Sequence, residues 1–583
     1  MHISYRKLLL ALGAFAATFA IHQGQANAAT ITVTASAVDQ TTNGNCSLYE
    51  AATAANTDAV VDGCTAGSGA DTINIPDGTY DLASMSFGPT FSATTTLVGQ
   101  SRSGTILNAT GGYQINLNGS NDAPTFTLRN LTLQDLIIEA TNDDASYLFD
   151  NILMYGANSQ IVARPETDGT DFGTFTISDS SIRNSEDGLL AQYFETITIT
   201  DSSFYENTNN NMQLTGTTVS LDGVDIYDSG AGAEINGGTV SLLNMNVFDN
   251  TAGGITVFNG NDDDAENLSI TIRNFALVRN TYDVGLMLGT DGGTGFSVDI
   301  ANMTIADNTS LLPALAFSIR DSIALTGTMN NVTVANNTRS GDVGGATYAG
   351  GAMINASGGV APTMTVKNLL IANNLDETTE RNCAPAGGEL YPFISGGNNL
   401  SDDSTCNSFN QASDQNGVNA VLGTLAQENG TWVLPLLAGS PAIDSGATIS
   451  DLTTDQRGAS RPQGSAYDLG AYEYGVLGEE TPDPTPTPPT TGNLANTADP
   501  NTLAVTGITP ISTLLLLGII LAVGTYTYRD YRKYKKPLTD ADPSVRYSYT
   551  HHIKVVSLPL FRYRLSFSTS KVSSKDESGI HKF

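Results

Sequence analysis

The chain has 583 residues, and its 59 Asp and Glu against 26 Lys and Arg give a formal net charge of −33. Such an acidic chain repels nucleic acid, so we exclude a nucleic-acid partner. All five His lie outside residues 30–528, at His2, His22, His551, His552 and His581. This region therefore lacks the imidazole that Ser-His-Asp catalysis, Cys-His catalysis or a His-ligated zinc site needs.

Residues 1–29 have the layout of a secretory signal peptide. Arg6 and Lys7 precede an apolar run that ends at Ile21, and the small residues Ala26 and Ala28 suit a cleavage site. We therefore expect an exported protein whose mature chain begins near residue 29 or 30.

Residues 30–96 are predicted to form an N-terminal cap. A strand over residues 30–35 is followed by an Ala-rich helix that continues to Asn56, and then by a strand, a turn and a strand over residues 72–82. Such a cap hides the open backbone edge and the apolar interior of the first coil of a solenoid from water.

Residues 97–375 repeat one short pattern: an apolar residue, a filler, usually Asn or Asp, then two residues and another apolar residue. The copies begin at Leu128, Phe149, Ile177, Ile199, Leu221, Leu242, Ile272, Ile300, Met329 and Val366. Repeats of this length with alternating apolar positions and turn-forming residues indicate a β-solenoid, in which each coil buries the apolar side of its neighbour. The predicted fold class is all-β, a parallel β-helix.

Alignment of the copies places Asn in two columns. The first column contains Asn130, Asn151, Asn244, Asn274, Asn302, Asn331 and Asn368, with Asp179, Asp201 and Gly223 in the remaining coils. The second column contains Asn207, Asn250, Asn280, Asn308 and Asn337. Stacked amides hydrogen-bond along the coil axis, and Asn tolerates the left-handed backbone of a sharp corner. We interpret both columns as structural.

A third column is acidic and supplies the candidate site. It contains Asp135, Glu206, Asp228, Asp249 and Asp307, with Arg279 at the same position. Glu206, Asp228 and Asp249 fall in successive coils, and neighbouring strands of a parallel sheet lie about 4.8 Å apart. Carboxylates at that spacing repel each other unless one is protonated or a cation lies between them.

Three interpretations of this column stay open. A pair of carboxylates about 5 Å apart suits a glycosidase. The trio Glu206, Asp228 and Asp249 would hold calcium, with Arg279 as the base of a polysaccharide lyase. Alternatively, these are turn residues that face water, as the Asn residues of the same column suggest, at Asn184, Asn336 and Asn373. A concave cleft along the column would favour catalysis, and an open corner would favour the last interpretation.

Residues 376–474 are predicted to cap the C-terminal end of the stack. We interpret Arg457, which lies near Asp444 and Asp468, as a structural residue that holds a loop against the last coil through a bidentate bond to a carboxylate. Trp432 is the only Trp of the chain and is too isolated in the sequence to provide a sugar-stacking platform.

The four Cys form two close pairs, Cys46 with Cys64 and Cys383 with Cys406, on either side of the repeats. In an exported chain, local disulfides are the favoured pairing. Neither pair has the spacing or the His partners of a zinc site. We therefore expect two disulfides that pin the ends of the stack.

Both ends of this region resemble modules of bacterial exported proteins. Residues 46–51 are similar to the N-terminal module named for the motif Cys-Ser-Leu-Arg-Glu-Ala (CSLREA), with Tyr49 in place of Arg. Residues 439–446, 455–458 and 468–473 resemble the closing module of the choice-of-anchor family, Q type. The region between is similar to pectin-lyase-like proteins. This resemblance, with the rule for parallel crossovers, implies a right-handed parallel β-helix of the kind that hosts polysaccharide lyases and glycosidases.

The last part of the chain is predicted to attach the protein to the cell envelope. Residues 475–502 are a Pro- and Thr-rich stalk of polyproline type, and residues 503–536 contain an apolar run that is long enough to cross a bilayer, with a basic cluster after it. Leu503, Thr506 and Gly507 resemble an LPxTG-like sortase signal with Ala in place of Pro, which implies a wall linkage through Thr506. A single transmembrane helix with a cytoplasmic tail over residues 537–583 explains the sequence equally well.

We interpret the chain as a cell-surface β-helix protein, anchored in the membrane or the cell wall. Its expected role is that of a non-catalytic adhesin or a scaffold for an extracellular glycan or a cell-surface protein, with the envelope membrane and a sortase as further partners. The competing interpretation is a polysaccharide lyase or glycoside hydrolase. A third is a structural envelope layer, which predicts self-assembly. Calcium is the one candidate cofactor.

Overall fold

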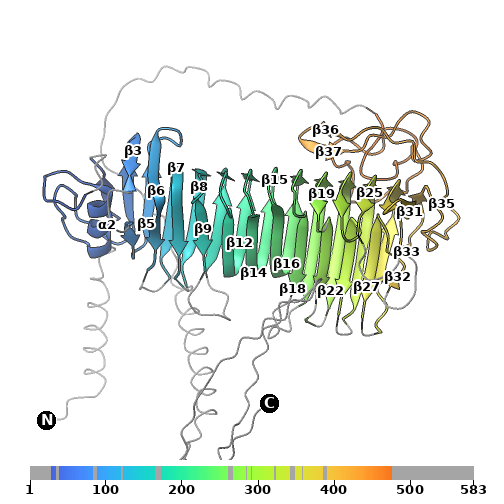
Figure 1. Ribbon diagram of the computed structural model, residues 1–583, viewed down its shortest axis with the longest axis horizontal. Helices are drawn as coiled ribbons and strands as arrows, with labels where there is room; N and C mark the ends of the chain where they lie inside the picture. The colour runs from blue at the N-terminus through green and yellow to red at the C-terminus, as the bar shows by residue number, and fades with distance from the viewer. Residues whose placement is uncertain are drawn as a thin grey trace, which may run out of the picture. The chain divides into compact units, whose positions relative to one another are not determined.

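The chain winds into a stack of parallel coils (Figure 1). The computed structural model describes residues 28–475 except for 35–38, 83–87, 120–122, 143, 165–172, 260–266, 284, 291, 294, 321–322, 342–347, 358 and 385–389. The predicted signal peptide, stalk, sorting signal, membrane segment and cytoplasmic tail lie outside the described residues. The exceptions are residues 28 and 29 of the signal peptide and residue 475 of the stalk. Within the described ranges, no helix has the length and apolar character needed to cross a membrane.

Each coil has three faces, which we name A, B and C; in one coil they are residues 196–200, 203–205 and 210–216. Face A is formed by β1 (Thr30–Thr32), β2 (Asp71–Ile75), β5 (Thr95–Gly99), β10 (Thr174–Ser178), β28 (Thr363–Lys367), β33 (Ile394–Ser395) and parts of the longer strands β7 (Thr125–Ala140), β8 (Ser146–Tyr155), β12 (Leu189–Thr200), β14 (Asn210–Asp222), β16 (Ala231–Leu243), β19 (Leu268–Val278), β22 (Phe296–Ala306) and β25 (Leu325–Ala335).

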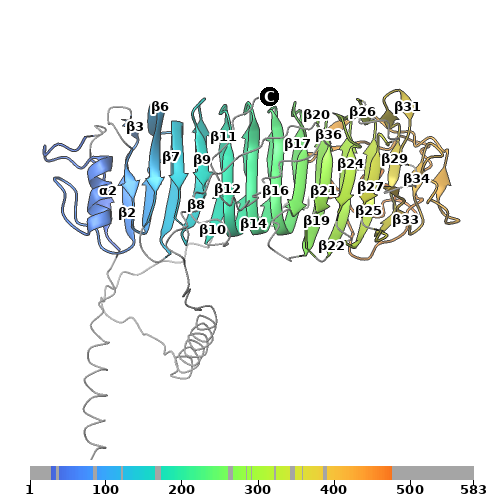
Figure 2. The same ribbon diagram turned by 60° about the horizontal axis from the view of Figure 1, so that its bottom comes forward.

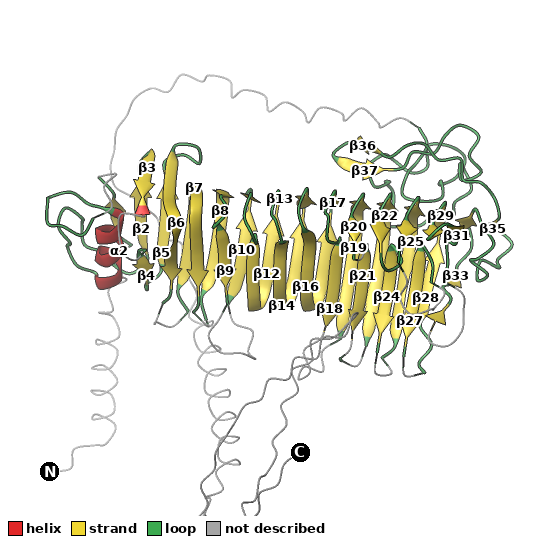
Figure 3. Cartoon of the chain, in the orientation of Figure 1, coloured by secondary structure: helices red, strands yellow, loops and turns green. Residues whose placement is uncertain are grey.

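The other two faces use shorter strands together with the remaining parts of the long ones. Face B contains β3 (Gly78–Asp81), β6 (Thr105–Leu117), β11 (Ser181–Arg183), β13 (Ser203–Tyr205), β15 (Asp225–Tyr227), β17 (Asn246–Phe248), β29 (Leu370–Ala372), β34 (Leu400–Ser401) and β35 (Gln415–Asn416). Face C contains β4 (Thr90–Phe91), β9 (Gln160–Ala163), β18 (Ile255–Asn259), β21 (Leu286–Thr290), β24 (Leu315–Ile319), β27 (Ala352–Ala356) and β32 (Leu390–Tyr391). Among the described strands, 30 join into one continuous sheet, and strands dominate the structure (Figure 3).

The interior follows from the register. Ile177 pairs with Ile199, Ile199 with Leu221, and Leu221 with Leu242, so each apolar position of the repeat stacks on its copy in the next coil. These side chains are fully buried. Because one coil cannot bury its own apolar side, the stacking supplies the hydrophobic stabilisation. The parallel β-helix predicted from the repeat is confirmed.

The first Asn column forms the corner between faces A and B. Its non-Gly members have φ between 46° and 57°, the left-handed region. Their amides bond from coil to coil, with Asn151 Nδ2 2.9 Å from Asn130 Oδ1 and Asn368 Nδ2 2.7 Å from Asn331 Oδ1. The structural role predicted for this column is confirmed.

The second Asn column lies inside the coil, where its members are buried and have ordinary backbone angles. Asn280 is typical. Its Nδ2 donates to the Val247 carbonyl at 2.9 Å and to Asn308 Oδ1 at 3.1 Å, and its Oδ1 accepts from Asn250 Nδ2 at 2.9 Å. This column is therefore also structural, but it satisfies buried backbone groups and does not form a left-handed turn.

The N-terminal end is covered by α2 (Leu48–Thr57). Ser47 and Glu50 form a capping box at its start, and Cys46 and Cys64 form the expected disulfide. Asn56 at the end of this helix donates to the Thr90 carbonyl at 2.7 Å, which ties the helix to the first coils. Parallel pairing already joins β1, β2 and β5, so coils are present before residue 97.

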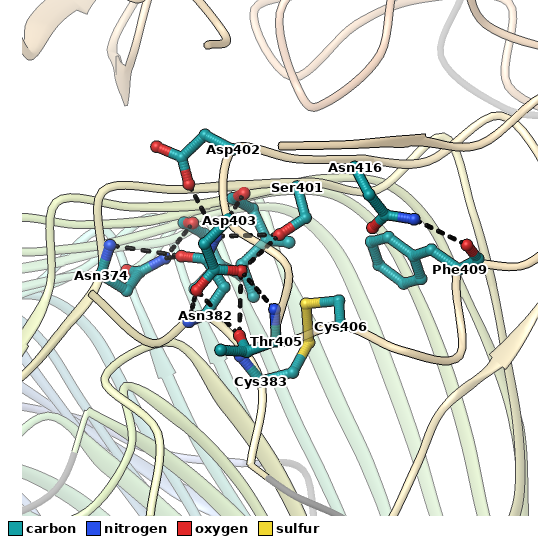
Figure 4. Close-up of a disulfide and its surroundings, with 12 residues drawn as sticks. Asn374, Asn382, Cys383, Ser401, Asp402, Asp403, Thr405, Cys406, Phe409 and Asn416 are labelled. Atoms are coloured by element: carbon teal, nitrogen blue, oxygen red, sulfur yellow. Dashed lines mark hydrogen bonds between the residues drawn. A yellow bond between two sulfur atoms is a disulfide. The ribbon is translucent and has the colours of Figure 1, made fainter. Parts of the chain in front are cut away.

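The C-terminal end folds back along the stack. Residues 418–475, which we name the C-terminal module, include the hairpin of β36 (Ala426–Glu428) and β37 (Thr431–Val433). This hairpin lies beside β19 (Figure 1). The short strands β20 (Thr281–Tyr282), β23 (Thr309–Ser310), β26 (Thr338–Arg339), β30 (Leu375–Asp376) and β31 (Thr379–Glu380) form a separate small sheet. The expected disulfide between Cys383 and Cys406 closes the last coil (Figure 4).

Candidate functional site

The acidic column forms the corner between faces B and C. All of its members, acidic or not, have φ between 49° and 59°, which is the left-handed region that Asn and Asp tolerate better than most residues. The side chains of Glu206 and Asp228 are exposed. The column therefore lies on an open corner, which favours the interpretation as turn residues over a catalytic cleft.

Arg279 lies in the coil after the acidic trio and forms an ion pair with the last carboxylate of the trio, Asp249. Its guanidinium binds the Asp249 carboxylate of the preceding coil through two hydrogen bonds, with Nε 2.7 Å from Oδ1 and Nη2 2.6 Å from Oδ2. Asp249 is thus already paired, and only Glu206 and Asp228 remain. In the described part of the chain, no three His, Cys, Asp or Glu side chains lie close enough together to hold a metal ion. This arrangement does not favour the calcium site that was one of the three interpretations of the column.

Asp228 is the carboxylate of the acidic trio that has no hydrogen-bond donor among the described residues. Burial raises the pKa of Asp228, the negative charges of Asp249 and Glu206 raise it further, and Arg279 opposes them. Its neighbour Glu206 accepts a hydrogen bond from Asn184 Nδ2 at 2.8 Å and has Arg183 at 3.9 Å. Among the described residues, no group donates a hydrogen bond to Asp228, so its carboxylate is open to an external donor.

An aromatic row runs beside the acidic column on face B. The rings of Tyr205 and Tyr227 stack at 4.8 Å with an interplanar angle of 4°, and those of Tyr227 and Phe248 at 4.8 Å with 3°. Arg183 extends the row at one end, 5.8 Å from the Tyr205 centroid. Because the rings stack on one another, they present their edges and hydroxyl groups outward.

Trp432 ends this row. Its ring lies 5.7 Å from Phe248 and 4.0 Å from the Arg279 guanidinium. The interpretation of Trp432 as isolated was wrong, because the C-terminal module carries it back to a residue 184 positions earlier in the chain. The rest of the row was visible in the sequence as an aromatic residue followed by an acid, Tyr205-Glu206, Tyr227-Asp228 and Phe248-Asp249.

The outward residues of face B change from aromatic to aliphatic where the C-terminal module begins to cover this face. In the coils after Phe248, the position of the aromatic row is taken by the buried residues Val278, Ala306, Ala335 and Ala372. Val278, Ala306 and Ala335 pack with Leu434, Leu436 and Leu469 of the C-terminal module. The hairpin is also fixed by Asn246, whose Nδ2 donates to the Gly430 carbonyl at 3.0 Å. Face B is thus half covered and half open.

Arg457 has a structural role, as we predicted, but its partners lie within the C-terminal module and not on the last coil. It is buried, its Nη2 lies 2.6 Å from Asp455 Oδ2, and its Nη1 lies 2.6 Å from Glu428 Oε2. The guanidinium also lies 3.5 Å from the centroid of the Tyr472 ring. This residue joins the hairpin to the end of the module and is not part of the open site.

The coils and their parallel pairing define the class of fold, a parallel β-helix. No family model matches the sequence, and no curated protein matches it. The chain is similar in structure to the A-module of the Azotobacter vinelandii mannuronan C-5 epimerase AlgE4, with 15% identity, 53% of this chain and 88% of that chain covered, and a TM-score of 0.37. It is also similar to pectate lyase Pel9A, with 15% identity, 77% and 97% covered, and a TM-score of 0.32. These likenesses concern the fold.

Proposed function

We propose that the chain is an exported, envelope-anchored β-helix protein whose open part of face B binds an extracellular glycan without cleaving it. The observation that carries the proposal is the pair of stacked rings of Tyr205 and Tyr227, each followed by an acid, on the part of face B that the C-terminal module leaves uncovered. Phe248 continues the row and marks the edge of that part, where Trp432 packs on it. Export and anchoring are proposed from residues 1–29 and 475–536, and an adhesive role would follow from them.

The open row offers donors and acceptors of hydrogen bonds side by side. Burial, with Tyr205 and nearby carboxylates, raises the pKa of Tyr227 to about 12, so its hydroxyl stays protonated and can donate. The carboxylates of Glu206 and Asp228 accept. A sugar hydroxyl both donates and accepts. A glycan that lies along the coil axis would meet such a pair of groups in two successive coils, at Tyr205-Glu206 and Tyr227-Asp228, about 4.8 Å apart.

A second candidate function is a glycosidase or polysaccharide lyase. The raised pKa of Asp228 beside Glu206 favours it, because retaining glycosidases use two nearby carboxylates with different pKa values. Two observations weigh against it. Both carboxylates stand on an exposed corner, and Arg279, the base proposed for a lyase, is held by Asp249.

The test is a glycan array together with an assay for new reducing ends, on the purified full chain with and without Asp228→Asn. The substitution should leave the left-handed backbone conformation of residue 228 unchanged, since Asn occupies the same corner position at Asn184 and Asn336. We expect wild type to bind glycan without producing new ends. Loss of a charge-assisted hydrogen bond of about 1.5–3 kcal/mol should weaken binding in the variant about tenfold or more.

The matched control is Glu234→Gln, which removes an exposed carboxylate from face C and should leave binding unchanged. New reducing ends that appear with wild type and vanish in Asp228→Asn would show an enzyme and contradict the non-catalytic proposal. Binding that survives both Asp228→Asn and Tyr227→Phe at full strength would show that the open part of face B is not the glycan site.

A further inference from the structure

Face A carries two rows of hydroxyl side chains that point outward from successive coils. The first row is Thr125, Ser146, Thr174, Thr196, Thr218, Thr239, Ser269, Ser297, Thr326 and Thr363. The second row is Thr30, Thr72, Thr96, Thr127, Leu148, Thr176, Thr198, Ser220, Ser241, Thr271, Asp299, Thr328 and Thr365. The strands of face A are stacked in parallel without a shift of register, and the stack of strands is seen in Figure 2. The outward positions of the two rows therefore form a regular two-dimensional array, which carries a hydroxyl group at every position except Leu148 and Asp299.

The array is open and almost uncharged. Asp299 is its one charged member, in a chain of net charge −33. Between Thr174 and Ser297, no hydroxyl of the two rows hydrogen-bonds to another described group of the chain. The C-terminal module packs on face B and leaves these rows uncovered. An occupant complementary to this surface is uncharged, rich in hydrogen-bonding groups and itself periodic.

Strand propensity alone does not explain the array. Thr is favoured on exposed strand positions because it is β-branched. Face C has the same parallel geometry, but its outward positions carry a mixture that includes Gln213, Glu234, Phe258 and Met287. Thr and Ser thus predominate in these two rows of face A, with Leu148 and Asp299 as the exceptions, and face C serves as an internal control. The third outward row of face A, next to the corner with face B, is mixed and includes Arg129, Asp222 and Arg273.

The spacing of the array approximates a lattice of water. Successive coils repeat at about 4.8 Å, and alternate residues of a strand at about 6.6 Å. Tetrahedral water joined by hydrogen bonds of about 2.75 Å repeats at about 4.5 Å and about 7.3 Å in hexagonal ice. The two grids agree within about a tenth in both directions. Because χ1 of Thr is stiff, its hydroxyl and methyl groups hold fixed positions and would hold first-shell water in fixed positions.

We infer that face A binds ice. The hydroxyl rows order a layer of water that joins the crystal, and the Thr methyl groups fill the spaces between the ordered molecules. Face A has no aromatic side chain among its two rows, so it lacks the stacking platform that would favour a crystalline polysaccharide. This activity uses a different face from the proposed glycan site and does not rest on it.

The test compares wild type with two double variants of the full chain. Thr198→Lys with Thr271→Lys places two charges in the middle of the second row. Thr215→Lys with Thr256→Lys places the same two charges on half-buried outward Thr positions of face C. The readouts are thermal hysteresis and retention of the labelled protein by a slowly growing ice crystal. Trp432 fluorescence and circular dichroism verify that all three proteins fold.

We expect wild type and the face C variant to be retained by ice and to show hysteresis, and the face A variant to lose both. Exclusion of wild type from ice would overturn the inference, as would equal activity of the two variants. If wild type is instead a dimer that the face A variant converts to a monomer, without retention by ice, the occupant is a second copy of the chain. Adsorption of wild type to crystalline chitin or cellulose through face A, but not to ice, would also refute it.

Discussion

Arg279 and Asp249, on neighbouring coils, form a bidentate ion pair directly beneath Trp432. The two hydrogen bonds measure 2.7 and 2.6 Å, and the guanidinium lies 4.0 Å from the centroid of the Trp432 ring. Both charged side chains are about one third exposed, at 30% and 34%. The pair therefore links the corner of the coil to the hairpin β36–β37 and marks where the C-terminal module stops on face B.

Replacement of Arg279 by Ala is expected to loosen this hairpin before the coils unfold. Loss of a partly exposed bidentate pair costs about 0.5–1 kcal/mol, and loss of the cation–π contact about as much, so the hairpin should lose about 1–2 kcal/mol. Trp432 is the only Trp, so its fluorescence reports on the hairpin directly. In a urea titration, the fluorescence midpoint should fall while the midpoint by circular dichroism changes little.

The control is Arg273→Ala. Arg273 pairs with Asp299 on face A and makes no contact with Trp432. This variant should leave the Trp432 transition where it is in wild type. Equal shifts of that transition in the two variants would contradict a local role for Arg279.

The buried Asn column predicts a larger effect on stability. Asn280→Ala leaves the Val247 carbonyl and the amides of Asn250 without their partner inside the coil. Unsatisfied buried polar groups cost about 1–3 kcal/mol each, so we expect a loss of about 2–4 kcal/mol. Asn274→Gly is the comparison, because Gly retains the left-handed corner at φ 51° and loses only an exposed bond to Asn244 and a partly buried bond from Asn302. Chemical denaturation that showed equal losses would refute the distinction between the two columns.

Stability is expected to fall as pH rises through the range set by Asp468. Burial raises the pKa of Asp468 from 3.8 to about 6, so between these values the folded state binds more protons than the unfolded state. The contribution is full at pH values below about 4 and is lost as pH rises to about 6, for a change of up to about 3 kcal/mol.

The measurement is the urea midpoint of Trp432 fluorescence from pH 4 to 7, in wild type and in Asp468→Asn. The variant cannot titrate at this position, so its midpoint should decline less across the window. An identical slope in both proteins would show that Asp468 is not the titrating group. A lower midpoint at every pH is also expected, since Asp468 accepts hydrogen bonds from the backbone amides of Asp444 and Tyr474.

The coils could be predicted from the repeat because each copy places a left-handed corner residue between two buried apolar positions. A left-handed Asn, Asp or Gly every 21 to 37 residues can only stack if each copy lies over the last, and the registers of Ile177, Ile199 and Leu221 follow from that. The open corner at Asp228 was among the three interpretations for the same reason, since Asn fills the same position in other coils. The pairing of Arg279 with Asp249 was not predicted, although both were placed in one column.

What the sequence could not supply was contact between distant segments. Nothing in the neighbourhood of Trp432 indicates that it lies on Phe248, because the contact depends on how residues 418–475 fold back over face B. The change from Tyr227 and Phe248 to Val278 and Ala306 along one row was a signal that an apolar cover begins there. The hydroxyl rows of face A were likewise present in the repeat, but their significance depends on knowing which positions face outward.

The two disulfides should stabilise only their own ends of the stack. Closure of a loop of 23 residues by Cys383 and Cys406 is worth about 3 kcal/mol, and closure of 18 residues by Cys46 and Cys64 about the same. In a solenoid, each coil contacts only its neighbours, so the effect of losing either disulfide stays local.

Ala replacement of both Cys at the C-terminal end should lower the urea midpoint of Trp432 fluorescence, because Cys383 pairs near the coils that the C-terminal module covers. The same replacement at Cys46 and Cys64 should lower the midpoint by circular dichroism and leave Trp432 unaffected. A Trp432 transition that responds equally to both would mean that the stack unfolds as one cooperative unit.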